Sequence, residues 1–112
     1  MIRFRFHFNN RRQWVDVTLY KVHPDTFERW GGGRWEYYEP DANRGREGLF
    51  GTMHFVADRV RPDVVAHCLI HLYGDIMRSR GKVWTAKNEE TIALQFDELT
   101  RNFWREYDKL GV

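Results

Sequence analysis

The chain has 112 residues, of which 42% are hydrophobic, 16% aromatic and 30% charged, and its formal net charge is +2. This apolar and aromatic content excludes a disordered chain, and the length predicts a single domain over residues 1–112. No apolar run approaches the roughly 18 residues of a membrane-spanning helix, so we expect none. The single cysteine excludes an internal disulfide and indicates a reducing compartment such as the cytoplasm.

The first half of the chain has the alternation of β-strands. Over residues 2–8, apolar positions alternate with Arg3, Arg5 and His7, which is typical of a half-buried strand. A polar turn at 9–12 and a second alternating segment at 13–22 predict a hairpin. After a helical turn at 26–30, further strands are expected at 34–39 and 49–56, with a polar loop at 40–48 between them.

The second half has the period of helices. A helix is predicted to begin near Pro62 and to end before Gly81. A second helix is expected from about residue 88 to 109. Strands followed by helices predict an α+β fold, with an antiparallel sheet of about four strands and two long helices. The predicted apolar stripes are Val65, Leu69, Leu72 and Ile76 on the first helix, and Ala93, Phe96, Leu99, Phe103, Tyr107 and Leu110 on the second.

Two histidines on the first helix suggest metal chemistry. His67 and His71 are four residues apart, so a helix places both imidazoles on one face, where they can reach the same ion. A third ligand usually comes from a neighbouring element. The next helix opens with Glu89 and Glu90, so we expect it to bring a carboxylate near the histidines.

At these residues the chain resembles the small zinc metallopeptidase-like (zincin) domains that are common in phages and mobile elements. Such domains carry HExxH on one helix and, on the next, a Glu followed three residues later by Ala. The matching stretches here are residues 67–71 and 90–93, and the resemblance covers about residues 48–110. It implies a zinc ion held by His67, His71 and Glu90, with Glu89 as the fallback ligand. It also implies that strand 52–56 is the edge strand that lines the substrate cleft.

The sequence departs from the family at the catalytic base. The Glu of HExxH is replaced by Cys68, which is shorter and cannot pass a proton from metal-bound water to a leaving amine in the same way. Loss of a positioned base removes about 10²–10⁴-fold in rate. No catalytic residue is therefore assigned, and we expect a pseudoenzyme rather than an active peptidase.

Three functions follow. The first is a catalytically impaired zincin-like protein that binds a macromolecular partner, a protein above all. Phage-encoded inhibitors of host defence are often single domains of this size, which suggests an anti-defence role by analogy. The second is an active zinc-dependent hydrolase that uses His54 or Asp75 as a substitute base. The third is nucleic-acid binding by the Arg-rich hairpin, which the near-neutral charge of the chain disfavours.

A structural role is the alternative for the same residues. His67 and His71 would be hydrogen-bonding side chains, and Cys68 a small core hydrophobe. Glu89 and Glu90 would be favourable first-turn carboxylates. We expect Asp75 to be a surface charge, and exposure of Trp84 or Trp104 would indicate a partner surface.

Overall fold

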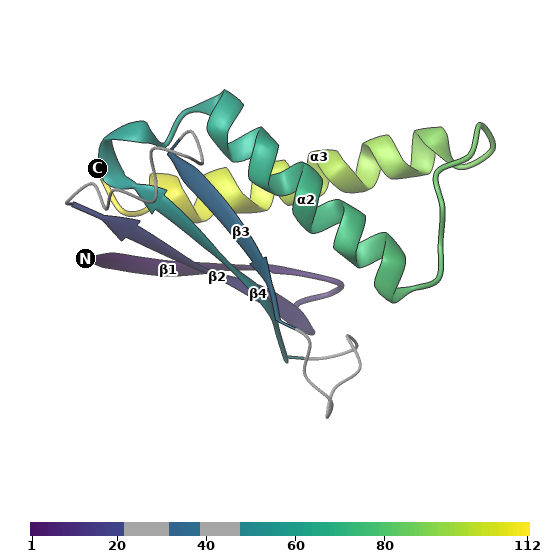
Figure 1. Cartoon of the computed structure of the whole chain (residues 1–112), viewed down its shortest axis with the longest axis horizontal. Coiled ribbons are helices and arrows are strands. Elements are labelled where there is room, and N and C mark those ends of the chain that lie inside the picture. Colours follow the sequence, from purple (N-terminus) through teal and green to yellow (C-terminus); the bar gives the residue numbers. More distant parts are fainter. Residues whose placement is uncertain (22–31, 39–47) are drawn as a thin grey trace.

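A computed structural model describes residues 1–21, 32–38 and 48–112 (Figure 1). The helical turn expected at 26–30, and all of the loop expected at 40–48 except its last residue, lie outside the described residues. The described part has four strands, a short 3-10 helix and two long helices. The α+β class predicted from the sequence is confirmed. Within the described part, no helix is both long and apolar enough to cross a membrane.

The strands form one mixed sheet. They are β1 (Ile2–Phe8), β2 (Gln13–Tyr20), β3 (Gly33–Tyr37) and β4 (Gly48–Val56), in the order β1-β2-β4-β3. The predicted β1–β2 hairpin is confirmed, with Phe6 opposite Val15. β3 is antiparallel to β4, but β4 is parallel to β2. The expectation of a purely antiparallel sheet was therefore wrong, because β4 inserts beside β2 instead of extending the sheet beyond β3.

This topology also moves the sheet edge. β4 is hydrogen-bonded on both sides, and the edge strand on that side of the sheet is β3. The expectation that residues 52–56 form the edge strand was wrong. Local alternation predicts that a segment is a strand, but it does not say which neighbours the strand pairs with.

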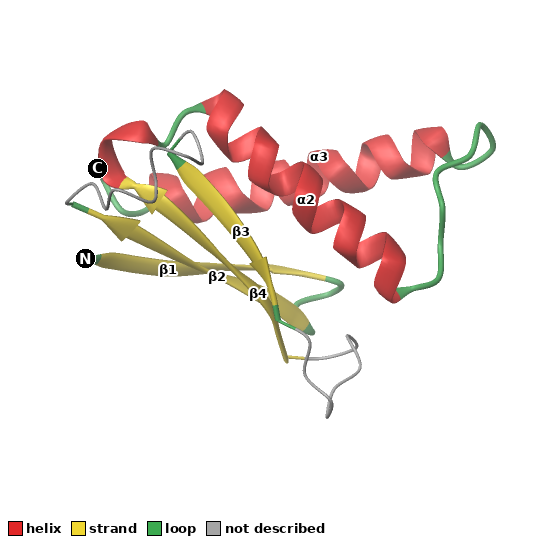
Figure 2. Cartoon of the chain, in the orientation of Figure 1, coloured by secondary structure: helices red, strands yellow, loops and turns green. Residues whose placement is uncertain are grey.

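The helices begin and end close to where the sequence signals place them. After η1 (Ala57–Arg59), α2 spans Pro62–Ser79, with Pro62 in its first turn, and Gly81 follows it with φ of 65°. α3 spans Glu89–Asp108. Both helices lie on the same face of the sheet and cross each other (Figure 2). The opposite face of the sheet is not covered by any described helix.

The core lies between the sheet and the helices. The predicted α2 stripe is buried throughout, at Val65, Leu69, Leu72 and Ile76. On α3, Leu99 and Phe103 are buried as predicted, but Ala93 is exposed and Ile92 takes its place. Ile92 lies seven residues before Leu99 and so shares its helix face, which corrects the predicted stripe at its first position.

Candidate functional site

The two predicted histidines lie side by side on the outer face of α2. Their ring centroids are 4.9 Å apart, as expected for residues one helical turn apart. Both side chains are exposed, because α2 turns its Val65, Leu69 and Leu72 face toward the sheet. The pair therefore faces solvent.

The carboxylates expected to complete a metal site do not join this pair. Glu89 and Glu90 are exposed in the first turn of α3. Among residues 1–21, 32–38 and 48–112, no three His, Cys, Asp or Glu side chains are grouped so that they could hold one ion. Zinc sites in proteins use three or four protein ligands. The described residues therefore bring together two of the three ligands that the resemblance implies, His67 and His71.

Cys68, at the position of the family's base, points into the core. Its exposed fraction is 0%, and burial raises the pKa of its thiol to about 12. At neutral pH the group is a protonated thiol, because the thiolate would lie in an apolar environment. It packs beside core residues such as Leu72, and it supplies neither a base nor a nucleophile.

The two side chains considered as substitute bases are both used elsewhere. The side chain of Asp75 is only 13% exposed and accepts a hydrogen bond of 2.6 Å from Nε1 of Trp35, in addition to an ion pair with Arg78. The expectation that Asp75 is a surface charge was wrong, because β3 passes close to α2. His54 lies on β4 between the buried Met53 and Phe55 and so faces the open side of the sheet, away from α2 and His67.

His54 belongs to a hydrogen-bonded cluster on that open face, which we call the His54 cluster (Tyr20, Glu36 and His54). Its Nε2 lies 2.8 Å from Oε1 of Glu36, and its Nδ1 lies 2.9 Å from the Tyr20 hydroxyl. An ionised carboxylate only accepts hydrogen bonds, so Nε2 carries the proton and Nδ1 accepts the one from Tyr20. Burial lowers the pKa of His54, and Glu36 opposes this shift. The imidazole thus bridges Tyr20 and Glu36 through its two ring nitrogens.

The sequence did not predict that the residues of the His54 cluster lie together. Alternation places each of its three residues on the polar face of its own strand, but the residues come from β2, β3 and β4. Only the register of the sheet brings Tyr20, Glu36 and His54 together.

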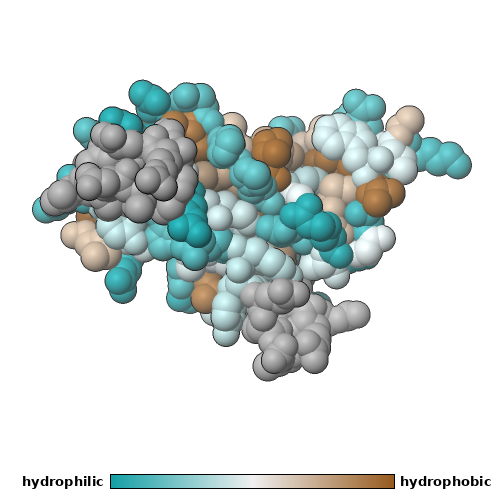
Figure 3. All heavy atoms as spheres, in the orientation of Figure 1, coloured by the Kyte–Doolittle hydropathy of each residue, from teal (hydrophilic) through white to brown (hydrophobic). Residues whose placement is uncertain are grey.

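Two tryptophans were considered as markers of a partner surface. Trp84 is 64% exposed and its neighbour Val83 is 71% exposed. Both lie in the segment between α2 and α3, which we call the helix connector (residues 80–88). Trp104 is half-buried and packs against Phe103, with ring centroids 5.1 Å apart. Figure 3 shows separate hydrophobic patches on the face drawn. Among the described residues, Val83 and Trp84 have the larger exposed fractions of the two adjacent pairs of exposed large hydrophobic residues, the other being Tyr37 and Tyr38.

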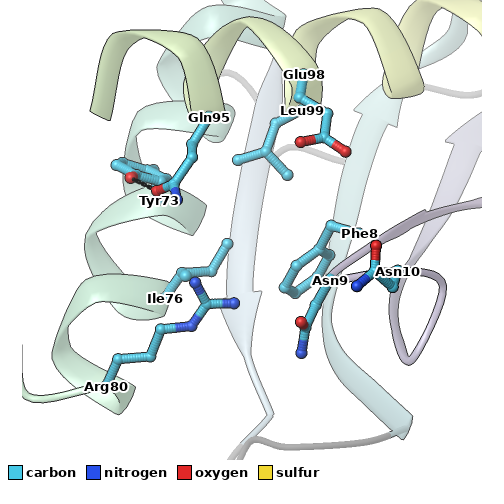
Figure 4. Close-up of a pocket in the computed structure, with 9 residues that line it drawn as sticks. All are labelled: Phe8, Asn9, Asn10, Tyr73, Ile76, Arg80, Gln95, Glu98 and Leu99. Atoms are coloured by element: carbon cyan, nitrogen blue, oxygen red, sulfur yellow. Dashed lines mark hydrogen bonds between the residues drawn. The ribbon is translucent and has the colours of Figure 1, made fainter. Parts of the chain in front are cut away.

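A cavity of about 170 Å³ lies between the hairpin turn and the two helices. In Figure 4 the Arg80 guanidinium lies across from the Asn9 and Asn10 side chains, with Glu98 above them. The Tyr73 hydroxyl at its wall donates to Oε1 of Gln95. This hydrogen bond joins α2 to α3, and the lining does not contain a paired nucleophile and base.

Comparison of the chain with models of protein families, with curated proteins and with solved structures finds no match.

Proposed function

We propose that the chain is a zincin-like domain that has lost its catalytic base and acts by binding a partner protein. The loss of catalysis is supported by Cys68, which replaces the base and is buried with a raised pKa. It is also supported by the positions of His54 and Asp75, neither of which is available to a water near His67 and His71. The size of the domain fits the phage-encoded inhibitors of host defence to which the resemblance points.

The observation that carries the binding proposal is the exposure of Val83 and Trp84. The helix connector extends beyond the sheet, at the end of the molecule opposite the two chain termini (Figure 1). A partner can therefore reach it without contacting the rest of the domain. Tryptophan is enriched among the residues that contribute most to protein–protein binding, because it buries a large rigid surface.

The charges around this dipeptide indicate the kind of partner. Lys82 and Lys87 are exposed on either side of Val83 and Trp84. A complementary protein surface would hold an apolar pocket for the indole, rimmed by acidic side chains. Rim charges of this kind speed association and select among partners.

The test compares Trp84→Ala with Leu94→Ala as a matched control, since Leu94 is also exposed, at 59%, but lies on α3. The unaltered chain is used to capture a partner protein from extracts of the cells in which the chain is expressed naturally. The captured protein is then purified, and the Kd of its complex with the unaltered chain and with each variant is measured. We expect Trp84→Ala to weaken binding about 30-fold or more and Leu94→Ala to leave it unchanged. Equal binding by both variants would reject the connector as the binding surface.

The catalytic half of the proposal has its own readout. Cleavage of a peptide library by the zinc-supplemented chain, abolished by chelator and by His67→Ala, would show that the chain is an active hydrolase. We expect no such cleavage.

A second function is favoured by the 4.9 Å separation of the His67 and His71 rings. Two exposed imidazoles at this spacing bind a divalent transition-metal ion such as zinc. We expect calorimetric titration with zinc to show one ion per chain, and His67→Ala to abolish binding. Glu90→Gln discriminates between the two ligand sets. Unchanged affinity supports a site made by the two histidines, whereas a loss of about 10-fold or more would establish Glu90 as the third ligand.

A further inference from the structure

A second surface, at the other side of the fold, carries an unexpected concentration of arginine. A groove of about 390 Å³ runs between the hairpin turn and the C-terminal half of α3. Arg11 from the turn and Arg101 and Arg105 from α3 line it, together with His7 of β1. We call this the arginine groove and define it by these four residues.

Contacts between α3 and β1 form the base of the groove. Nδ2 of Asn102 donates a hydrogen bond of 2.9 Å to the backbone oxygen of His7. The neighbouring side chains Phe4 and Phe103 pack with ring centroids 5.5 Å apart. These contacts place the arginines of α3 beside β1.

Three arginines of the groove outnumber the two carboxylates, Glu98 and Glu106, that also line it. For Arg11, Arg101 and Arg105, no ion pair with a carboxylate is found within the described part of the chain. Glu98 and Glu106 also line the groove, but Glu106 is paired with Lys109 at 3.0 Å. Burial lowers the pKa of His7, and the charges of Arg11 and Arg5 lower it further, while Glu106 and Asp16 oppose the shift. Several guanidinium groups thus act on the same small volume.

The backbone of the turn is left-handed at three consecutive residues. Asn9, Asn10 and Arg11 have φ of 55°, 55° and 66°. Asparagine tolerates the left-handed region, but arginine adopts it at an energetic cost. Here that conformation places the Arg11 side chain at the groove.

An aromatic ring lies next to the groove on the open face of the sheet. His7 lines the groove and its ring centroid is 6.0 Å from that of Trp14. The Trp14 ring is half-buried, and the Arg5 guanidinium, paired with Asp16 at 3.1 Å, lies over it at 4.8 Å from its centroid. A base that stacks on Trp14 must therefore displace Arg5. Arginines that hold phosphates beside a ring on which a base can stack are the pattern of proteins that bind single-stranded nucleic acid.

We propose that the arginine groove binds the phosphate backbone of single-stranded nucleic acid, with Trp14 stacking on an adjacent base. The near-neutral charge of the whole chain is compatible with this site, because the binding charge is local. This surface is separate from the helix connector, so either proposal can fail while the other stands.

The test measures anisotropy of a labelled 12-nucleotide deoxythymidine strand at 50 mM and 200 mM salt. Neutralising three phosphates predicts a roughly 20-fold weaker affinity at the higher salt. Arg101→Ala combined with Arg105→Ala should weaken binding at 50 mM salt by about 10-fold or more, because it removes two of the three phosphate contacts. The control is Lys82→Ala combined with Lys87→Ala, which removes the same charge from the helix connector and should leave binding unchanged.

A Trp14→Ala variant separates nucleic acid from polyanions in general. We expect it to weaken binding of the deoxythymidine strand about 5-fold or more while leaving binding of heparin unchanged. Circular dichroism confirms that each variant is folded. Absence of binding at 50 mM salt, or equal loss in the arginine and lysine variants, would overturn the proposal. Equal effects of Trp14→Ala on the strand and on heparin would reduce the groove to a general polyanion site and overturn the stacking claim.

Discussion

Gly51 on β4 lies so close to β3 that a side chain does not fit at this position. A Cβ atom at this position would lie 2.6 Å from the backbone oxygen of Glu36 and nearer still to Cη2 of the Trp35 indole. The indole cannot move aside freely, because its Nε1 is hydrogen-bonded to Asp75. Glycine is required here by space rather than by a left-handed backbone.

Gly74 on α2 is the matched case in which a methyl group fits. A Cβ atom there would meet Nη1 of Arg78 at 3.5 Å, an ordinary contact. We expect Gly51→Ala to lower the free energy of unfolding by about 1–3 kcal/mol. We expect Gly74→Ala to raise it by about 0.5–1 kcal/mol, because alanine restricts the unfolded chain and favours the helix. Urea unfolding of both variants measures this, and a shift of the same sign in both would contradict the packing argument.

At the scale of elements, α2 contacts β3 through Asp75, one helical turn beyond His71. Asp75 accepts the Trp35 Nε1 hydrogen bond from one side and pairs with Arg78 on the other. The rotation of α2 about its axis is set by the burial of its apolar face against the sheet. This rotation places Cys68 in the core and leaves the two histidines exposed.

Removing this contact should loosen the attachment of β3 to the helix. We expect Asp75→Ala to lower the free energy of unfolding by about 1–3 kcal/mol, since it leaves the half-buried Trp35 N–H without its acceptor. The control is Asp97→Ala, an exposed position on α3, where a change within about 0.5 kcal/mol is expected. Chemical denaturation compares the two, and equal effects would show that the Trp35–Asp75 hydrogen bond does not tie β3 to α2.

At the scale of the whole molecule, three surfaces are kept apart by the fold. The helix connector lies at one end of a molecule that measures 42 × 31 × 28 Å, and both termini lie at the other (Figure 1). The histidine pair is on the outer face of α2, and the arginine groove lies where α3 meets β1. The sheet separates the His54 cluster from the histidine pair. Each proposed surface can therefore be changed by mutation without altering the others.

The elements themselves could be predicted from local patterns. Alternation at 2–8, the proline at residue 62 and the four-and-three spacing of the α2 stripe all depend on neighbours within a few residues, and the structure confirms them. The position of Ile92 in place of Ala93 was missed, because the start of a stripe is decided by what the helix packs against.

The partners of each element could not be predicted in this way. Parallel pairing of β4 with β2, the edge position of β3 and the Trp35–Asp75 hydrogen bond each join residues far apart in the sequence. The i, i+4 spacing brought His67 and His71 together from the sequence alone, since a single helix sets that distance. Whether a carboxylate from α3 lies beside them depends on how two helices cross, and only the packing of both helices on the sheet decides that.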